Sequence, residues 1–100
     1  MNSFLEPPCA TVFQGFNYGG WGHDLLETDH GSLFGTDRDH DVSSVKVREG
    51  CTLEGFDDKD LESWIFSFNA DQPEINDVLV NDKLTSYSCK CSKNRFPYQN

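Results

Sequence analysis

Residues 81–86 read Asn-Asp-Lys-Leu-Thr-Ser, and residues 39–44, which lie 42 positions earlier, read Asp-His-Asp-Val-Ser-Ser. Each hexapeptide is an acidic turn that ends in two hydroxyl side chains. Alone, either one could be a solvated turn, because the side chains of Asp, Asn, Ser and Thr hydrogen-bond to nearby backbone groups. Together they indicate that the chain has two similar halves, in which the same turn leads into a strand.

The side chains of both hexapeptides are rich in oxygen, and carboxylate, amide, hydroxyl and carbonyl oxygens are the ligands that Ca²⁺ prefers in proteins. The whole chain has 17 acidic and 8 basic residues and a formal net charge of -9. This charge disfavours nucleic acid and anionic membranes as partners and favours cations. No apolar run is long enough for a membrane span. We therefore expect the paired turns to bind calcium ions.

The rest of the chain supports the repeat. The first half is expected to hold strands at residues 9–16, 24–27 and 44–48, a glycine-rich turn at 17–22 and an irregular crossing connection at 28–41. The second half begins at Cys51 and repeats this order, with a returning strand at 64–68, a crossing loop at 69–80 and a last strand at 84–91. Pro73 excludes a central strand from that loop. No segment has helical periodicity over ten or more residues.

These strands predict an all-β protein, a sandwich of two four-stranded Greek-key motifs. The domain is expected to span residues 9–91, with the first Greek key at about 9–49 and the second at about 50–91. Residues 1–8 and 92–100 are expected to be tails. A chain of 100 residues is long enough to bury one core.

Aromatic residues and glycines recur in a fixed order in the first half. Phe13, Tyr18 and Gly20 follow the pattern aromatic, four residues, aromatic, one residue, glycine. In the second half, Leu61 and Ser63 stand at the positions of the second aromatic and the glycine, so that turn is the weaker match. The pattern resembles that of the βγ-crystallins.

The hexapeptides strengthen this resemblance, because the calcium motif of the βγ-crystallins is Asn/Asp-Asn/Asp-x-x-Ser/Thr-Ser. Residues 81–86 match it at every defined position, and residues 39–44 depart from it only at His40. The resemblance covers roughly residues 9–91. It implies a non-catalytic sandwich of two Greek keys in which Ca²⁺ bridges the two motif loops and stabilises the fold.

The resemblance also implies a ligand set, because each ion is held by groups from both motifs. One site would use the Asp41 carbonyl, the Ser43 hydroxyl, the Asp82 carboxylate and a carbonyl near Gln14. The other site would use the Lys83 carbonyl, the Thr85 hydroxyl, a carbonyl near Asp57 and the His40 side chain, and Asp39 and Asn81 would support the two sites. Imidazole is a poor ligand for a hard cation, so we expect the second site to be the weaker one.

Four cysteines, Cys9, Cys51, Cys89 and Cys91, favour two disulfides in an oxidising compartment. No signal peptide is visible, so the location stays open, with an extracellular one favoured. Cys89 and Cys91 share one face of a strand, so each is expected to pair with another cysteine. The repeat places the start of each first strand near the end of each last strand. This favours Cys51 with Cys89 or Cys91, and Cys9 with the remaining one. A zinc site is disfavoured, because only one residue separates Cys89 from Cys91.

Other interpretations fit the sequence less well. An EF-hand loop beginning at Asp37 would have Val42 at its glycine position and Arg48 at its glutamate position. The histidines lie in loops without the nucleophile that a catalytic set would need, so we do not expect an enzyme. Two alternatives to calcium binding stay open. One is a secreted effector, a protease inhibitor or toxin, acting through residues 69–80; the other is a structural protein with vestigial calcium binding. We expect a monomer or weak dimer.

Overall fold

The computed structural model describes residues 7–92. In this range the chain forms strands, one 3₁₀ turn and no α-helix, and no helix there is long and apolar enough to cross a membrane. The elements are β1 (Ala10–Phe13), η1 (Phe16–Tyr18), β2 (Gly22–Leu25), β3 (Thr28–Ser32), β4 (Ser44–Val47), β5 (Cys51–Phe56), β6 (Trp64–Phe68) and β7 (Ser86–Cys91). The expected tails lie almost entirely outside the described residues. The all-β prediction is confirmed.

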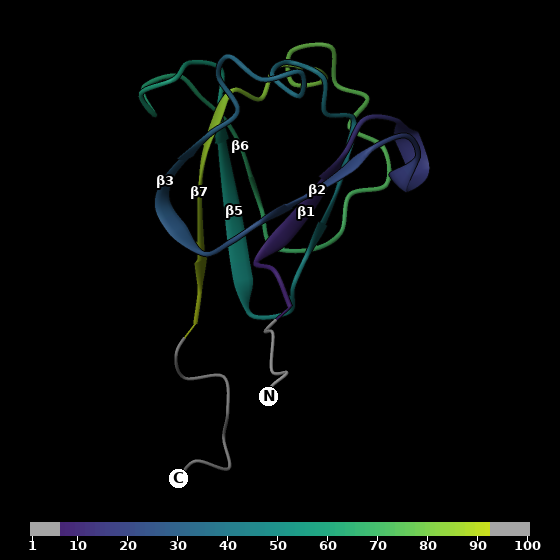
Figure 1. Cartoon of the computed structure of the whole chain (residues 1–100). Coiled ribbons are helices and arrows are strands. Elements are labelled where there is room, and N and C mark those ends of the chain that lie inside the picture. The colour runs from purple at the N-terminus through teal and green to yellow at the C-terminus, as the bar shows by residue number, and fades with distance from the viewer. Residues whose placement is uncertain (1–6, 93–100) are drawn as a thin grey trace, which may run out of the picture.

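The strands form two antiparallel sheets that enclose one core (Figure 1). One sheet has the order β2-β1-β4 and the other has the order β3-β7-β5-β6. Strand β3 leaves the first half and pairs with β7 of the second half, while Gln72 of the second half bridges Val45 of β4. Each half therefore gives its third segment to the sheet of the other half, which is the connection of two Greek keys.

The third segment of the second half is a single bridge rather than a strand. The Gln72 N–H donates to the Val45 carbonyl at 2.8 Å, and the Val45 N–H donates back to the Gln72 carbonyl at 3.0 Å. The next residue, Pro73, has no N–H with which to extend this ladder. The second motif therefore has three strands and one bridge where four strands were predicted.

Strand β3 lies in a stretch, residues 28–41, that we expected to be irregular, and this expectation is wrong for its first five residues. The strand is polar because it is the edge of its sheet and exposes most of its side chains. It is held by contacts with β7. Any side chain at position 31 would clash with the Tyr87 ring, which packs over Gly31, and the Asp29 carboxylate lies 2.8 Å from Lys90 Nζ. Pairing with β7 thus overrides the polar composition.

The core is built from alternate strand positions of both halves. Val45 and Val47 of β4 are buried, and so are Tyr87 and Cys89, which we expected to occupy the same positions in β7. Alternate residues of a strand share a face, so each pair points into the space between the sheets. The predicted symmetry of the two halves holds at these positions.

Two disulfides, Cys9–Cys89 and Cys51–Cys91, cross-link the sheets and strands near one end of the sandwich. The first ties the residue before β1 to β7 across the core, and the second joins the neighbouring strands β5 and β7. The predicted pairing is confirmed, because Cys89 and Cys91 each bond to a different partner. The bridges close loops of 80 and 40 residues. Constraint of the unfolded chain then contributes about 4.5 and about 4 kcal/mol respectively.

Candidate metal centre

The two hexapeptide turns lie side by side at the end of the sandwich where the chain enters β4 and β7 (Figure 1). The N–H of Asp82 donates to the Val42 carbonyl at 3.1 Å, and the N–H of His40 donates to the Leu84 carbonyl at 3.0 Å. These bonds join equivalent positions of the two repeats, so the turns have an approximate two-fold relation. Two turns that are far apart in the sequence are thus adjacent in the structure.

The second position of each hexapeptide has a left-handed backbone, with φ of 59° at His40 and 61° at Asp82. Among residues other than glycine, Asn, Asp and His are the ones most often found in this region. His40 therefore preserves the turn that the motif requires. Its departure from the motif changes the donor atom and not the backbone.

Side chains of the first predicted ligand set are in contact across the two halves of the chain. The Ser43 hydroxyl donates to Asp82 Oδ1 at 3.1 Å. The Gln14 side-chain amide donates to Asp41 Oδ2 at 3.3 Å. The Ser43 N–H donates to the Phe13 carbonyl at 2.9 Å, which holds the turn against the end of β1. The hydroxyl, carboxylate and carbonyl oxygens of this group are the donors that fit Ca²⁺.

The side chains of the second predicted ligand set form two contacting pairs. The Thr85 hydroxyl, the counterpart of Ser43, donates to Asp39 Oδ1 at 2.7 Å. His40 Nε2 lies 2.9 Å from Asp57 Oδ1, and both side chains are well exposed. The Thr85 hydroxyl thus has Asp39 as its partner, and the His40 side chain lies beside Asp57 of the same predicted set. Sequence reasoning placed Asp39 in a supporting role only.

Asn81 and Lys83 flank Asp82 in the second hexapeptide. The Asn81 Oδ1 atom is buried and has no hydrogen-bond partner among residues 7–92. Leaving such an oxygen unsatisfied costs about 1–3 kcal/mol, which a nearby cation or a water molecule would offset. Lys83 has an exposed side chain, and its backbone N–H donates to the Val80 carbonyl at 3.1 Å. The backbone carbonyl of Lys83 is therefore the group with which this residue could bind a metal ion.

Two serines that sequence reasoning left out tie the turns to the hairpins. Ser44 Oγ donates to the Gly15 carbonyl at 2.6 Å and accepts from the Tyr18 N–H at 3.0 Å. Ser86, its counterpart, donates to the Asp58 carbonyl. Both serines are fully buried. Their structural role could have been suspected from the sequence, because both copies of the motif have serine at the sixth position although this position lies outside the ligand set.

Asp58 has a structural role that distinguishes it from its neighbour Asp57. Its Oδ1 accepts from the N–H groups of Glu62 and Ser63 at 2.9 and 2.8 Å, and its Oδ2 accepts from Asp60 at 3.1 Å. Desolvation opposes ionisation of Asp58, but these backbone donors outweigh it and lower the pKa of the carboxyl. Asp58 thus holds the β5–β6 hairpin, and Asp57 is the carboxylate that faces the paired turns.

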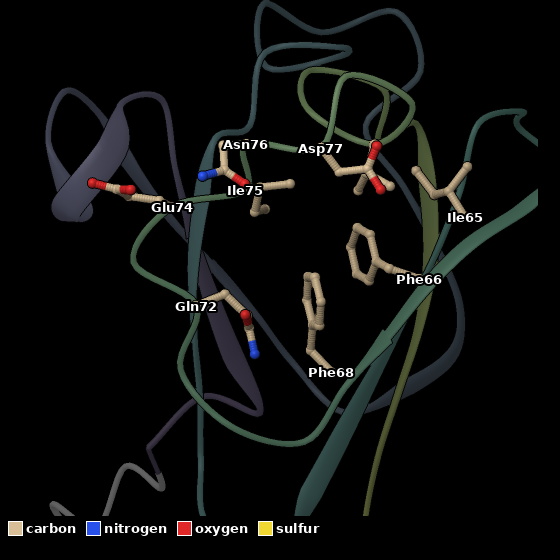
Figure 2. A pocket seen from close by; sticks show the side chains of 9 residues that line it. Ile65, Phe66, Phe68, Gln72, Glu74, Ile75, Asn76 and Asp77 are labelled. Carbon is tan, nitrogen blue, oxygen red and sulfur yellow. The ribbon is translucent and has the colours of Figure 1, made fainter.

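A pocket of the described chain lies between β6 and the crossing loop (Figure 2). It has a volume of about 330 Å³ and is lined by Ile65, Phe66, Phe68, Gln72, Glu74, Ile75, Asn76, Asp77 and Val80. The rings of Phe66 and Phe68 stack with their centroids 4.2 Å apart. The pocket thus combines apolar rings with the polar side chains of the crossing loop.

Comparisons with known proteins find relatives by structure alone. No protein-family model matches the chain, and no curated protein matches it. A βγ-crystallin domain from Clostridium beijerinckii is 22% identical, with a TM-score of 0.74 over 84% of this chain and 99% of that one.

A second βγ-crystallin domain, from Flavobacterium johnsoniae, is also 22% identical, with a TM-score of 0.74 over 85% of this chain and 97% of its own length. The N-terminal domain of protein S is 21% identical, with a TM-score of 0.70 over 82% of this chain and 94% of that chain. Similarity at this level of identity establishes the fold. The chain has the βγ-crystallin fold, as its paired motifs predicted.

Proposed function

We propose that this chain is a non-catalytic calcium-binding domain in which Ca²⁺ bridges the turns at residues 39–44 and 81–86. The observation that carries the proposal is the contact of 3.1 Å between the Ser43 hydroxyl and Asp82 Oδ1, which come from opposite halves of the chain. Ca²⁺ binds oxygen at about 2.3–2.6 Å, so two oxygens at this separation can share one ion. An ion held there would join the two Greek keys.

The charge around the turns supports a cation rather than an anion. Asp39, Asp41 and Asp82 belong to the turns themselves and Asp57 faces them, in a chain with a formal net charge of -9. Like charges held close together destabilise the compact state, and a bound divalent cation relieves this repulsion. Calcium would therefore stabilise the fold, by about 2.7 kcal/mol at a free concentration one hundred times its dissociation constant.

The two sites should differ in affinity. The site of Asp82, Ser43 and Asp41 has carboxylate and hydroxyl donors from both halves. At the other site, His40 replaces the acidic residue of the motif and lies against Asp57. With few protein ligands at each ion, we expect dissociation constants of roughly 10⁻⁶ to 10⁻⁴ M, the second weaker than the first.

Calorimetric titration of metal-free protein with CaCl₂ tests this proposal. The informative variant is Asp82→Asn, which keeps the left-handed turn and removes the charge. A matched control is Asp24→Asn on β2, which also removes one charge but can still accept the hydrogen bond from Thr11. We expect Asp82→Asn to weaken the stronger site at least tenfold and Asp24→Asn to leave it unchanged. Absence of binding by the parent protein at millimolar calcium would refute the proposal.

A specific observation also favours the effector alternative, which acts through the loop at residues 69–80. Val78 and Leu79 at its tip are 81% and 75% exposed. The tip is nevertheless constrained, because Asp77 accepts from the Leu79 N–H through Oδ1 and from the Val80 N–H through its carbonyl. An exposed, constrained apolar loop suits the docking of a protease or receptor. Inhibition assays against a panel of proteases, with Leu79→Asp as the inactive variant, test this alternative.

A further inference from the structure

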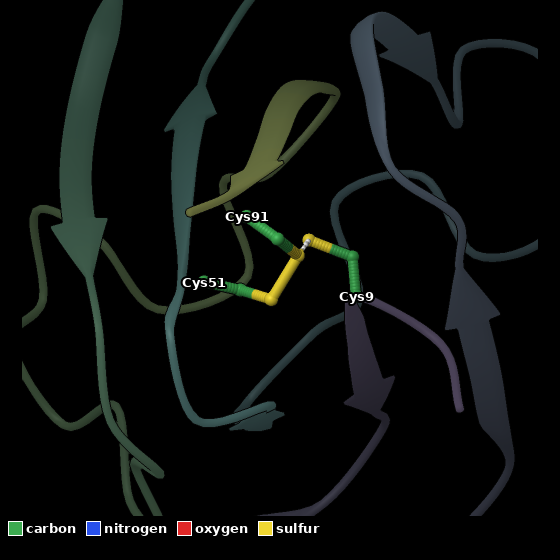
Figure 3. Close-up of side chains that lie close together, drawn as sticks. All are labelled: Cys9, Cys51 and Cys91. Carbon is green, nitrogen blue, oxygen red and sulfur yellow. Dashed lines mark hydrogen bonds between the residues drawn. A yellow bond between two sulfur atoms is a disulfide. The ribbon is translucent and has the colours of Figure 1, made fainter. Parts of the chain in front are cut away.

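The four cysteines form a compact sulfur cluster at the end of the sandwich where β7 finishes. Figure 3 shows three of them, Cys9, Cys51 and Cys91. The sulfurs of Cys9 and Cys91, which belong to different disulfides, lie 3.6 Å apart. The sulfurs of Cys9, Cys51 and Cys91 all lie within 4.8 Å of one another, and Cys89 is bonded to Cys9. The two bridges are therefore in contact and form one group of four sulfurs.

The backbone, and not only the S–S bonds, brings these cysteines together. Cys51 on β5 stands directly opposite Cys91 on β7, and Leu53 stands opposite Cys89 in the same ladder. Cys89 and Cys91 are two apart on one strand, so all three side chains lie on one face of their sheet. Cys9 precedes β1 in the facing sheet and approaches from the other side. Breaking the disulfides would leave four thiols converging on the same point.

We propose that the reduced chain binds one zinc-class ion through the thiolates of Cys9, Cys51, Cys89 and Cys91, in place of the two disulfides. Zn²⁺ binds thiolate sulfur at about 2.3 Å in tetrahedral sites, which sets the sulfurs about 3.8 Å apart. The separation of 3.6 Å between Cys9 and Cys91 is close to that value. Spacing along the chain argued against zinc, but the register of β5 and β7 supplies a convergence that spacing does not reveal.

Arg48 is already directed at this cluster. Its Nη2 lies 3.3 Å from the Cys91 sulfur and its Nε lies 3.5 Å from the Cys51 sulfur, while Nη1 donates to the Pro7 carbonyl at 2.9 Å. Nitrogen donors and a positive charge beside sulfur favour thiolates, and such outer contacts orient metal ligands. Cys9, Cys51 and Cys89 are buried and Cys91 is partly exposed, which gives the ion an entry route.

Conversion of the disulfide-bonded chain into the metal-bound chain requires a reductant. Each disulfide takes two electrons and two protons from a dithiol reductant, which is itself oxidised to a disulfide. The four thiols then release up to four protons to solvent as the ion binds their thiolates. The proposed calcium ligands lie at the opposite end of β7, so this site is independent of the proposed function.

Cobalt titration of the reduced chain tests the proposal. The protein is reduced with a water-soluble phosphine, which takes its oxygen from water to become the phosphine oxide while each disulfide becomes two thiols. It is then titrated with Co²⁺. We expect one ion per chain, an intense thiolate-to-cobalt charge-transfer band with the visible bands of tetrahedral cobalt, and displacement by one equivalent of Zn²⁺. The oxidised chain should show none of these.

Three variants complete the test. Cys9→Ser should weaken the charge-transfer band and lower the affinity at least tenfold. Arg48→Met should lower the affinity about tenfold with the spectrum unchanged. Asp24→Asn, the charge control on β2, should bind cobalt like the parent. Absence of the band would overturn the proposal. So would an equal affinity in the urea-unfolded reduced chain, because the fold would then not organise the ligands. Equal binding by Cys9→Ser would overturn it as well.

Discussion

Ser43 and Ser44 are adjacent, but their hydroxyls have different partners, so alanine at each position should separate the calcium site from the fold. Ser44 is fully buried and satisfies two backbone groups, the Gly15 carbonyl and the Tyr18 N–H. Each buried group left unpaired costs about 1–3 kcal/mol. Because the hairpin is partly accessible to water, we expect Ser44→Ala to lose about 2–3 kcal/mol in total, or roughly 10 °C or more in melting temperature.

Ser43→Ala should behave differently, because the partner of this hydroxyl within residues 7–92 is the half-buried Asp82 carboxylate. Water can replace the lost donor, so the metal-free variant should lose only about 1 kcal/mol. The larger effect should appear with calcium. At a concentration that stabilises the parent by about 2.7 kcal/mol, a tenfold loss of affinity reduces the gain to about 1.4 kcal/mol.

Urea unfolding of the oxidised proteins, followed by tryptophan fluorescence with chelator and with calcium, measures both quantities. The parent and Ser44→Ala should share one calcium-dependent gain, although Ser44→Ala starts from a lower stability. Ser43→Ala should start near the parent and gain about half as much. If Ser43→Ala gains as much as the parent, Ser43 is not a ligand. If Ser44→Ala loses the gain, the two serines do not have separate roles.

Four further outcomes follow from the structure. His40→Asp should strengthen the second calcium site, seen by calorimetry as two ions of similar affinity, because Asp tolerates the left-handed turn and supplies oxygen. Replacing Cys51 and Cys91 together by serine should lower the free energy of unfolding by about 4 kcal/mol in urea titrations. Asp58→Asn should make the free energy of unfolding less dependent on pH in acid. The lowered native pKa of Asp58 contributes stability above its ordinary value of 3.8, and this stability is lost as the pH falls through the native pKa. Acid titration followed by circular dichroism measures the difference between the variant and the parent. Gly31→Ala should destabilise the β3–β7 pair by about 1–3 kcal/mol, because its methyl group meets an aromatic ring, and amide exchange in β3 should rise.

Local pattern was enough to predict the strands that contribute alternate side chains to the core. Residues 64–68 form β6 with the predicted bounds, and the β4 and β7 positions that we assigned to the core are buried. Strand β3 was not predicted, because its residues do not alternate between apolar and polar. Its formation depends on β7, more than fifty residues away, and on the room at Gly31 for an aromatic ring.

The candidate site shows the same division between repeated and individual features. The resemblance to the βγ-crystallins implied that Ser43 and Asp82 would share one site across the halves, and these side chains are in contact. The contact between Thr85 and Asp39 could not be predicted from the repeat, because the partner of Thr85 comes from the first motif position rather than the second. The repeat thus predicts which backbone segments lie side by side. It does not predict the partner of each side chain where one copy departs from the motif, as at His40.

Histidine at position 40 leaves the fold intact but changes the atoms that one of the two candidate sites can offer to a metal ion. The turn needs a residue that tolerates a left-handed backbone, and His40 satisfies this with a φ of 59°. Its backbone N–H still donates to the Leu84 carbonyl, so the two turns remain joined. The side chain instead lies against Asp57, and Asp39 takes the place beside the Thr85 hydroxyl. The pairing of the turns is therefore a property of the backbone, whereas the proposed calcium affinity rests on side-chain oxygens. One substitution can change those oxygens without disturbing the paired turns.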